Sequence, residues 1–196
     1  GARLAGAPSF NGRRMTPDPV FLELLSLLKR AHILGTVGDL LSWDEQVNLP
    51  SGAAEQRAAQ QSTLAETQHA AASDPRIGEL LADLETRVAP LDEDQRVIVA
   101  HARREYDRAT KLPADFVREK ATQGSRGYHA WAKAKAADDF AGYAPVLEKN
   151  LALAKREAGY LGWAGREYDY MIDRHDPGMT AAAISRLFAE LKTELV

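Results

Sequence analysis

The histidines and carboxylates, which most often hold catalytic metals, are widely spread along this sequence. The chain has five histidines, and no two of them are three or four residues apart, so the His-Glu-x-x-His helix of zinc peptidases is absent. One Glu-x-x-His pair occurs, formed by Glu66 and His69. Ferritin-like bundles use two such pairs together with further glutamates. A single pair on a polar helix therefore favours a solvent-facing surface over a di-metal site.

Two other groups of titratable residues could suggest acid–base chemistry. Asp44 and Glu45 are adjacent, but neighbouring residues of a helix point about 100° apart, so the two carboxylates cannot act on one substrate atom as a close pair. His175 and Asp176 precede Pro177 in a loop, where a histidine beside a carboxylate could bind a metal or move a proton. Without a second cluster, a capping or hydrogen-bonding role is favoured.

Composition excludes several classes of function. The absence of cysteine rules out disulfides, thiolate metal sites and cysteine nucleophiles, and it is compatible with a cytoplasmic protein. The formal net charge of -3 provides no overall attraction to nucleic acid. No apolar run reaches the roughly 18 residues of a membrane span, and neither a Gly-x-Gly-x-x-Gly nor a Walker loop occurs. We therefore expect neither nucleic acid nor a membrane as a partner.

Helical periodicity runs along almost the whole chain and predicts an all-α fold, a bundle of about seven to eight helices with no sheet. We expect Gly35 and Gly38 to kink or split the first helix, and Gly124 and Gly127 to interrupt the fifth. The sixth helix should begin near Tyr143, end at Gly162 and bury a regular stripe, which comprises Leu147, Leu151, Ala154, Ala158 and Leu161.

The segment 40–60, "LLSWDEQVNLPSGAAEQRAAQ", is typical of an elbow between the first two helices. Pro50 and Gly52 would break and restart the chain, and Trp43 would anchor the elbow in the core. On this interpretation, Trp43→Ala costs about 3 kcal/mol or more of stability. Direct contact of Trp43 with a substrate is the alternative. Trp131, near Lys133 and Lys135, could likewise stack on a ligand but is favoured as half-buried core.

The two ends of the chain differ in character. Residues 1–14 are rich in Gly, Ala and Arg and precede Met15, and we interpret them as a disordered leader or a cloning remnant. The last helix, capped by Thr180, stops in the middle of an apolar stripe, which comprises Ile184, Leu187, Phe188, Leu191 and Leu195. That face needs a partner, so we expect residues 15–196 to be the helical domain of a longer protein, truncated in its last helix.

Four stretches resemble the amino-terminal half of the carboxypeptidase Taq family of metallocarboxypeptidases (metallopeptidase family thirty-two). The elbow resembles the family's Trp-Asp-x-x-x-x-x-Pro pattern and the helix after it, through Trp43, Asp44, Pro50, Gly52, Glu55 and Arg57. "REYDRATKLPADFVREKA" resembles its Leu-Pro helix start. The run from Trp131 to Leu147 and the "DPGMT" loop resemble two further motifs. Lys135 and Asp176 depart from the arginine and glutamate expected there.

The resemblance implies a helical, two-lobed peptidase that removes residues from peptide carboxyl termini and is typically a homodimer. In that family zinc or cobalt is held by His-Glu-x-x-His and a downstream glutamate, and the metal activates a water. None of these residues occurs here, so the resemblance assigns this chain no catalytic, metal or cofactor residue. Instead, it would form one wall or lid of the substrate groove. Candidates for contacts with the groove or with the catalytic half are Trp43, Asp44, Arg57, Trp131 and His175.

A second hypothesis stays open from the sequence alone. The chain could be a free-standing regulatory or interaction module without catalytic activity, whose last helix docks on a partner or on another copy through its exposed apolar edge. A reading frame that continues after Val196 to a His-Glu-x-x-His would favour the carboxypeptidase, whereas a stop codon there would favour the module.

Overall fold

A computed structural model of the protein describes residues 18–86, 91–163 and 165–195, and in these ranges it contains helices and no strand. This confirms the predicted all-α fold. The predicted leader, residues 1–14, lies outside the described residues. The elements are α1 (Pro19–Val47), the 3-10 turn η1 (Ser51–Ala53), α2 (Ala54–Ala72), α3 (Pro75–Thr86), α4 (Glu93–Lys111), α5 (Ala114–Ala136), α6 (Phe140–Tyr160), α7 (Glu167–His175) and α8 (Ala181–Leu195).

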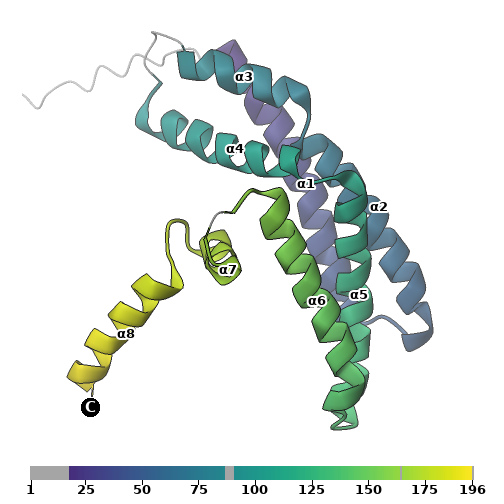
Figure 1. The fold of residues 1–196 in the computed structure, drawn as a ribbon. Coiled ribbons are helices and arrows are strands. Elements are labelled where there is room, and N and C mark those ends of the chain that lie inside the picture. The colour runs from purple at the N-terminus through teal and green to yellow at the C-terminus, as the bar shows by residue number, and fades with distance from the viewer. Residues whose placement is uncertain (1–17, 87–90, 164, 196) are drawn as a thin grey trace, which may run out of the picture.

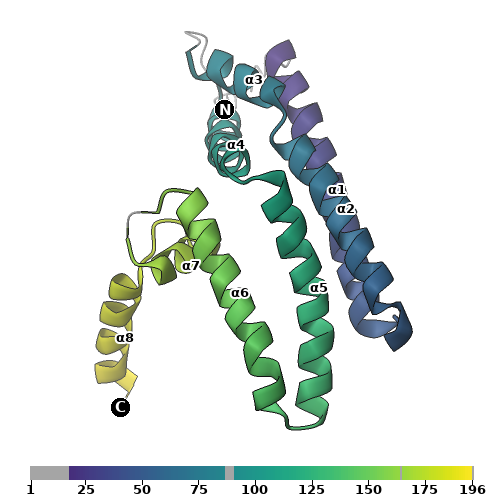
Figure 2. The same cartoon turned by 45° about the vertical axis from the view of Figure 1, so that its right-hand side comes forward.

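The long helices α1, α2 and α5 run side by side, and α6 returns along α5 as an antiparallel partner (Figure 1). Helices α3 and α4 cover one end of this layer. Helices α7 and α8 lie on the side of α6 away from α1 and α2, and α8 extends outward from α7 (Figure 2). No helix in the described ranges has the length and apolar character to cross a membrane.

Local capping chemistry explains where the helices begin and end. Asp18 accepts a hydrogen bond from the Val20 N–H at 2.8 Å and starts α1. Asp92 and Gln95 form a reciprocal capping box at the start of α4. Gly162, with a φ of 70°, follows the end of α6 as predicted. The predicted cap of α8 is also confirmed, since the Ala183 N–H donates to Thr180 Oγ1 at 3.2 Å.

Several sequence predictions about α1, α5 and α6 were wrong. Helix α1 is continuous through its glycines, and a Cβ on Gly35 would lie 2.8 Å from Gln68 Nε2 of α2. Helix α5 also runs without a break, and a Cβ on Gly127 would make only ordinary contacts with α6, the nearest at 3.5 Å to Asn150. Helix α6 begins three residues earlier than expected, because Asp139 caps it. Its buried face is rotated, so Leu151 is exposed and Leu153 is buried.

The largest apolar core joins α1, α3 and α4 at one end of the molecule. Its buried side chains are Phe21, Leu24, Ile77, Leu80, Leu81, Leu84, Val99 and Ala102. Trp43 is not part of any core, because 56% of its surface is exposed. Glu45, two residues after Trp43, faces the interior of the protein. Residues two positions apart on a helix are rotated by about 200°, so the Trp43 side chain faces the opposite side. The prediction that Trp43 anchors the elbow was therefore wrong.

The losses of stability caused by Leu81→Ala and Trp43→Ala test which of the two side chains belongs to this core. Leu81 is fully buried, so Leu81→Ala should lower the free energy of unfolding by about 2–5 kcal/mol, the usual cost of a cavity in a packed core. Trp43→Ala should change it by less than about 1 kcal/mol, because the ring faces solvent. Urea denaturation followed by circular dichroism measures both. A larger loss for Trp43→Ala than for Leu81→Ala would contradict the described packing.

Candidate functional site at the helix elbow

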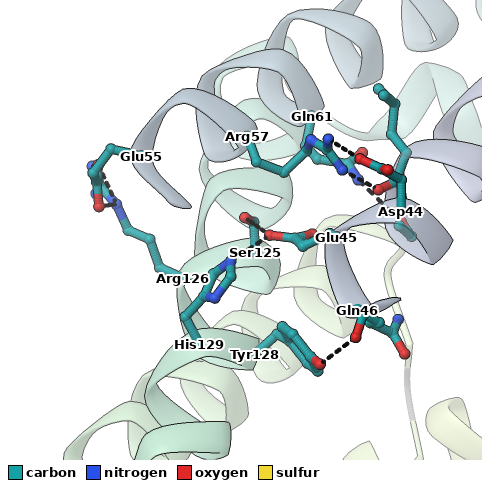
Figure 3. A network of polar contacts seen from close by, with 12 residues as sticks. Asp44, Glu45, Gln46, Glu55, Arg57, Gln61, Ser125, Arg126, Tyr128 and His129 are labelled. Carbon is teal, nitrogen blue, oxygen red and sulfur yellow. Dashed lines mark hydrogen bonds and ion pairs between the residues drawn. The ribbon is translucent and has the colours of Figure 1, made fainter. Parts of the chain in front are cut away.

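The elbow between α1 and α2 is the richest polar junction near the predicted site residues (Figure 3). Helix α1 ends where the backbone N–H groups of Asn48 and Leu49 both donate to the Asp44 carbonyl, at 2.8 and 3.1 Å. Pro50 is extended, and the carbonyl of Pro50 accepts from the Ala53 N–H to start η1. The chain thus reverses within a few residues and lays the start of α2 against the end of α1.

Asp44 and Arg57 lock the two arms of the elbow together. The Arg57 guanidinium donates to the Asp44 carboxylate and to the Leu41 carbonyl, and it donates to Gln60 Oε1 at 3.0 Å. Arg57 is buried. The hydrogen bond from Arg57, aided by one from Asn48, lowers the pKa of the Asp44 carboxyl. The Asp44–Arg57 ion pair therefore has a structural role, which is to join the end of α1 to the start of α2.

Glu45 points the other way, toward α5, and is buried (Figure 3). The Ser125 hydroxyl donates to Glu45 Oε1 at 2.5 Å, and His129 Nε2 lies 2.9 Å from the same oxygen. Ser125 and His129 are four residues apart, so they share one face of α5. A buried carboxylate is tolerated only with such partners. These three side chains, Glu45, Ser125 and His129, are called the Glu45 clasp below.

The Glu45 clasp borders a cavity of about 290 Å³ between α1, α2 and α5. Its polar lining consists of Ser42, Glu45, Gln46, Gln61, Gln68, Ser125 and Tyr128. Gln61 Nε2 donates to Ser42 Oγ at 3.0 Å, and the Tyr128 hydroxyl lies 3.5 Å from the Gln46 carbonyl. Amide and hydroxyl groups of this kind suit water or a small hydrogen-bonding ligand.

The clasp is not arranged like a serine hydrolase triad. In such a triad the histidine accepts the proton of the serine and the carboxylate orients the histidine. Here the described hydrogen bonds of the Ser125 and His129 side chains both end on Glu45. Ser125 therefore donates to the Glu45 carboxylate and not to His129.

The predicted contact residues fall into three places. Asp44 and Arg57 meet at the elbow, while Trp43 faces solvent. Trp131 is 41% exposed farther along α5, with Lys135 Nζ 4.8 Å from its ring centroid. His175 is exposed at the end of α7, which packs on α6 and α8. The structure does not gather all five residues, and their contact with a substrate groove stays a prediction.

Sequence reasoning missed the Glu45 clasp. The Ser125-x-x-x-His129 spacing was the available signal, because it places two hydrogen-bonding side chains on one helix face. Its partner on α1 could not be found from the sequence, since Glu45 is 80 residues away from Ser125 along the chain.

Metal binding finds no support in the described part of the chain. Glu66 Oε1 pairs with Arg118 Nη1 at 2.5 Å. No group of three or more His, Cys, Asp or Glu side chains there is placed to hold an ion. The side chains of residues 18–86, 91–163 and 165–195 therefore do not form a set that fits a catalytic metal, and the di-metal hypothesis for Glu66 and His69 gains no support.

The helical architecture is that of part of a metallocarboxypeptidase. The crystal structure of BsuCP matches with a TM-score of 0.83 and 31% identity, over 90% of this chain and 35% of that chain. The M32 carboxypeptidase of Deinococcus radiodurans R1 matches with a TM-score of 0.72 and 39% identity, over 90% and 35% of the two chains.

The sequence comparison leads to the same group. Thermostable carboxypeptidase 1 of Thermus thermophilus is 34% identical over 92% of this chain and 38% of its own length. Carboxypeptidase 1 of Bacillus subtilis is 31% identical over 89% and 35%. The model of the carboxypeptidase Taq (M32) metallopeptidases matches residues 23–196, and the chain belongs to this family.

The match covers only part of the length of the longer relatives. The chain spans little more than a third of the length of these curated carboxypeptidases. It corresponds to their helical amino-terminal part, as the resemblance predicted. The alternative of a free-standing interaction module is not favoured.

A double-mutant cycle tests the Glu45 clasp. Glu45→Ala should lower the free energy of unfolding by about 2 kcal/mol or more, because Ser125 and His129 lose their shared acceptor. Ser125→Ala should cost about 1 kcal/mol, and the pair should couple by about 1 kcal/mol. Asp39→Ala, at an exposed position of the same helix, is the control, with a change within about 0.5 kcal/mol. Strictly additive losses for Glu45 and Ser125 would contradict the contact.

The Asp44–Arg57 pair predicts a pH dependence. The folded state lowers the pKa of the Asp44 carboxyl, so the pair stabilises the protein above the unfolded value, near 4. This stability is lost as pH falls through the lower folded value. Asp44→Asn should therefore be less stable than the wild type at pH 7, and the difference should shrink below about pH 4.

Glu55→Gln is the matched comparison for Asp44→Asn. Arg126 lowers the pKa of Glu55 in the same way, but both partners are more than half exposed and solvent screens them. The pH-dependent difference should be smaller for Glu55→Gln. Denaturation midpoints between acid and neutral pH measure both, and an equal or reversed order would contradict the assigned role of Arg57.

Proposed function

We propose that this chain acts as the amino-terminal helical domain of a metal-dependent carboxypeptidase, which removes residues from the carboxyl termini of peptides. The single observation that supports this most strongly is the family match over residues 23–196, with the agreement of the fold. In this proposal the parent binds zinc or cobalt through residues outside the described chain, and it works as a cytoplasmic homodimer on peptide substrates.

The proposed task of this domain is to form a wall or lid of the groove. Because its residues do not fit a metal, no step of hydrolysis is assigned to them. An outward face of α1 supports the proposal, since its exposed apolar side chains are Ile33, Val37, Leu40, Trp43 and Val47. Helix α8 has exposed Leu187, Phe188, Leu191 and Leu195 in addition. Large apolar surfaces of this kind usually meet another part of a protein.

The proposal places the elbow in a supporting role. The Asp44–Arg57 pair and the Glu45 clasp hold α1, α2 and α5 at set angles. That rigidity would keep the outward apolar face of α1 in register with the catalytic half. Glu45, Ser125 and His129 would therefore affect hydrolysis through position, without contact with the scissile bond.

Metal analysis and a peptidase assay on the 196-residue chain test the proposal. The chain dialysed against zinc or cobalt should retain well below one ion per molecule, because the described part holds no ligand cluster. It should release no amino acid from carboxyl-terminal peptide substrates. Retention of one tightly bound ion per chain, or metal-dependent hydrolysis by the chain alone, would contradict the proposed division of roles.

A further inference from the structure

A second and larger cavity lies away from the elbow. It measures about 560 Å³, opens to solvent and is lined by side chains of α2, α4, α5, α6 and α7. This volume falls within the range of small-molecule sites, roughly 300–1,000 Å³. Its walls combine a group of cationic side chains with an apolar floor, and neither feature is used by the Glu45 clasp.

The cationic group surrounds one buried carboxylate. Glu157 of α6 is 5% exposed. The Lys120 ammonium of α5 donates to Glu157 Oε2, and Arg174 Nη1 of α7 lies 3.5 Å from Glu157 Oε1. Although burial opposes it, the contact with Lys120 holds the pKa of Glu157 below its ordinary value. Glu157 is therefore an ionised carboxylate that is already shared between two cations.

A third cation adds positive charge to the same wall. The Arg108 guanidinium carbon of α4 lies 5.7 Å from the ring centroid of Tyr170 and borders the cavity. Burial lowers the pKa of Lys120, and the positive charges of Arg174 and Arg108 add to the effect. The lining has three basic side chains, Arg108, Lys120 and Arg174, against two acids, Glu105 and Glu157. An anion in the cavity would relieve the repulsion among these cations.

The rest of the lining is apolar. Leu112, Phe116 and Val117 contribute the larger side chains, and alanines of α2, α4 and α5 leave the volume between them open. Phe116 is itself 1% exposed and is held by an edge contact with Tyr160, at 5.0 Å between ring centroids. An inorganic anion would leave this apolar surface uncovered, whereas an organic anion would cover it.

We propose that this cavity is a binding site for a small organic carboxylate. The carboxylate group contacts Arg108 and Lys120, where a guanidinium can form two parallel hydrogen bonds. The apolar body lies over Leu112 and Phe116. The lining of the site comes from five helices, α2, α4, α5, α6 and α7, and the site does not depend on the proposed peptidase activity.

Isothermal titration of the 196-residue chain with isovalerate tests the proposal. Isovaleramide, which has the same shape without the charge, and inorganic phosphate, which has charge without an apolar body, are the comparison probes. We expect saturable binding of isovalerate that weakens with added salt, and binding at least tenfold weaker for both comparison probes. Equal binding of isovaleramide or of phosphate, or no saturable binding of isovalerate, would overturn the proposal.

Arg108→Gln supplies the matched variant. Among the described hydrogen bonds and ion pairs, Arg108 has no carboxylate partner, so the substitution leaves no buried carboxylate without its cation. Circular dichroism checks that the variant keeps its helices. We expect isovalerate affinity to fall about tenfold or more. Arg76→Gln removes a cation of α3 that pairs with exposed Glu23 and should leave binding unchanged. Equal affinity for Arg108→Gln and the wild type would overturn the assignment of this cavity.

Discussion

The burial of one carboxylate, that of Glu45, constrains how the long helices meet. A buried carboxyl group is stable in such a place only where hydrogen-bonding partners surround it, and Ser125 and His129 supply them from successive turns of α5. This requirement sets the rotation of α1 about its own axis. Once Glu45 faces inward, Trp43 and Leu40 must face outward, and the apolar face of α1 becomes a surface for another part of the protein.

Helix α5 is the common support of both polar centres. One of its faces completes the Glu45 clasp, and Lys120, nearer its start, pairs with the buried Glu157 of α6. Gln123 lies between them and donates to Asn150 of α6 at 3.0 Å. Polar contacts of this kind demand specific partners, whereas the apolar core of α1, α3 and α4 tolerates repacking. Helix α6 therefore packs on α5, whereas α1 packs chiefly on α2 and α3 and gains a further polar anchor on α5 through Glu45.

Periodicity and capping residues were sufficient to predict the helices and several of their ends, since these depend on neighbours in sequence. Asp18, Gly162 and Thr180 are examples. The glycines misled because the helices run through them unbroken, and Gly35 lies close to Gln68 of the neighbouring helix. The Glu45 clasp could not be predicted from the sequence, because it joins residues 80 or more positions apart. The motifs at the elbow pointed to the family that the match over residues 23–196 then showed.

Hydrogen exchange, measured segment by segment in the wild type and in Glu45→Gln, tests most directly whether the Glu45 clasp joins α1 to α5. The substitution keeps the size of the side chain and removes its charge. The account predicts faster exchange at the end of α1 and in the middle of α5 together, with α3 and α4 unchanged. Faster exchange in α1 alone, or no change in either helix, would contradict the claim that this carboxylate holds the long helices together.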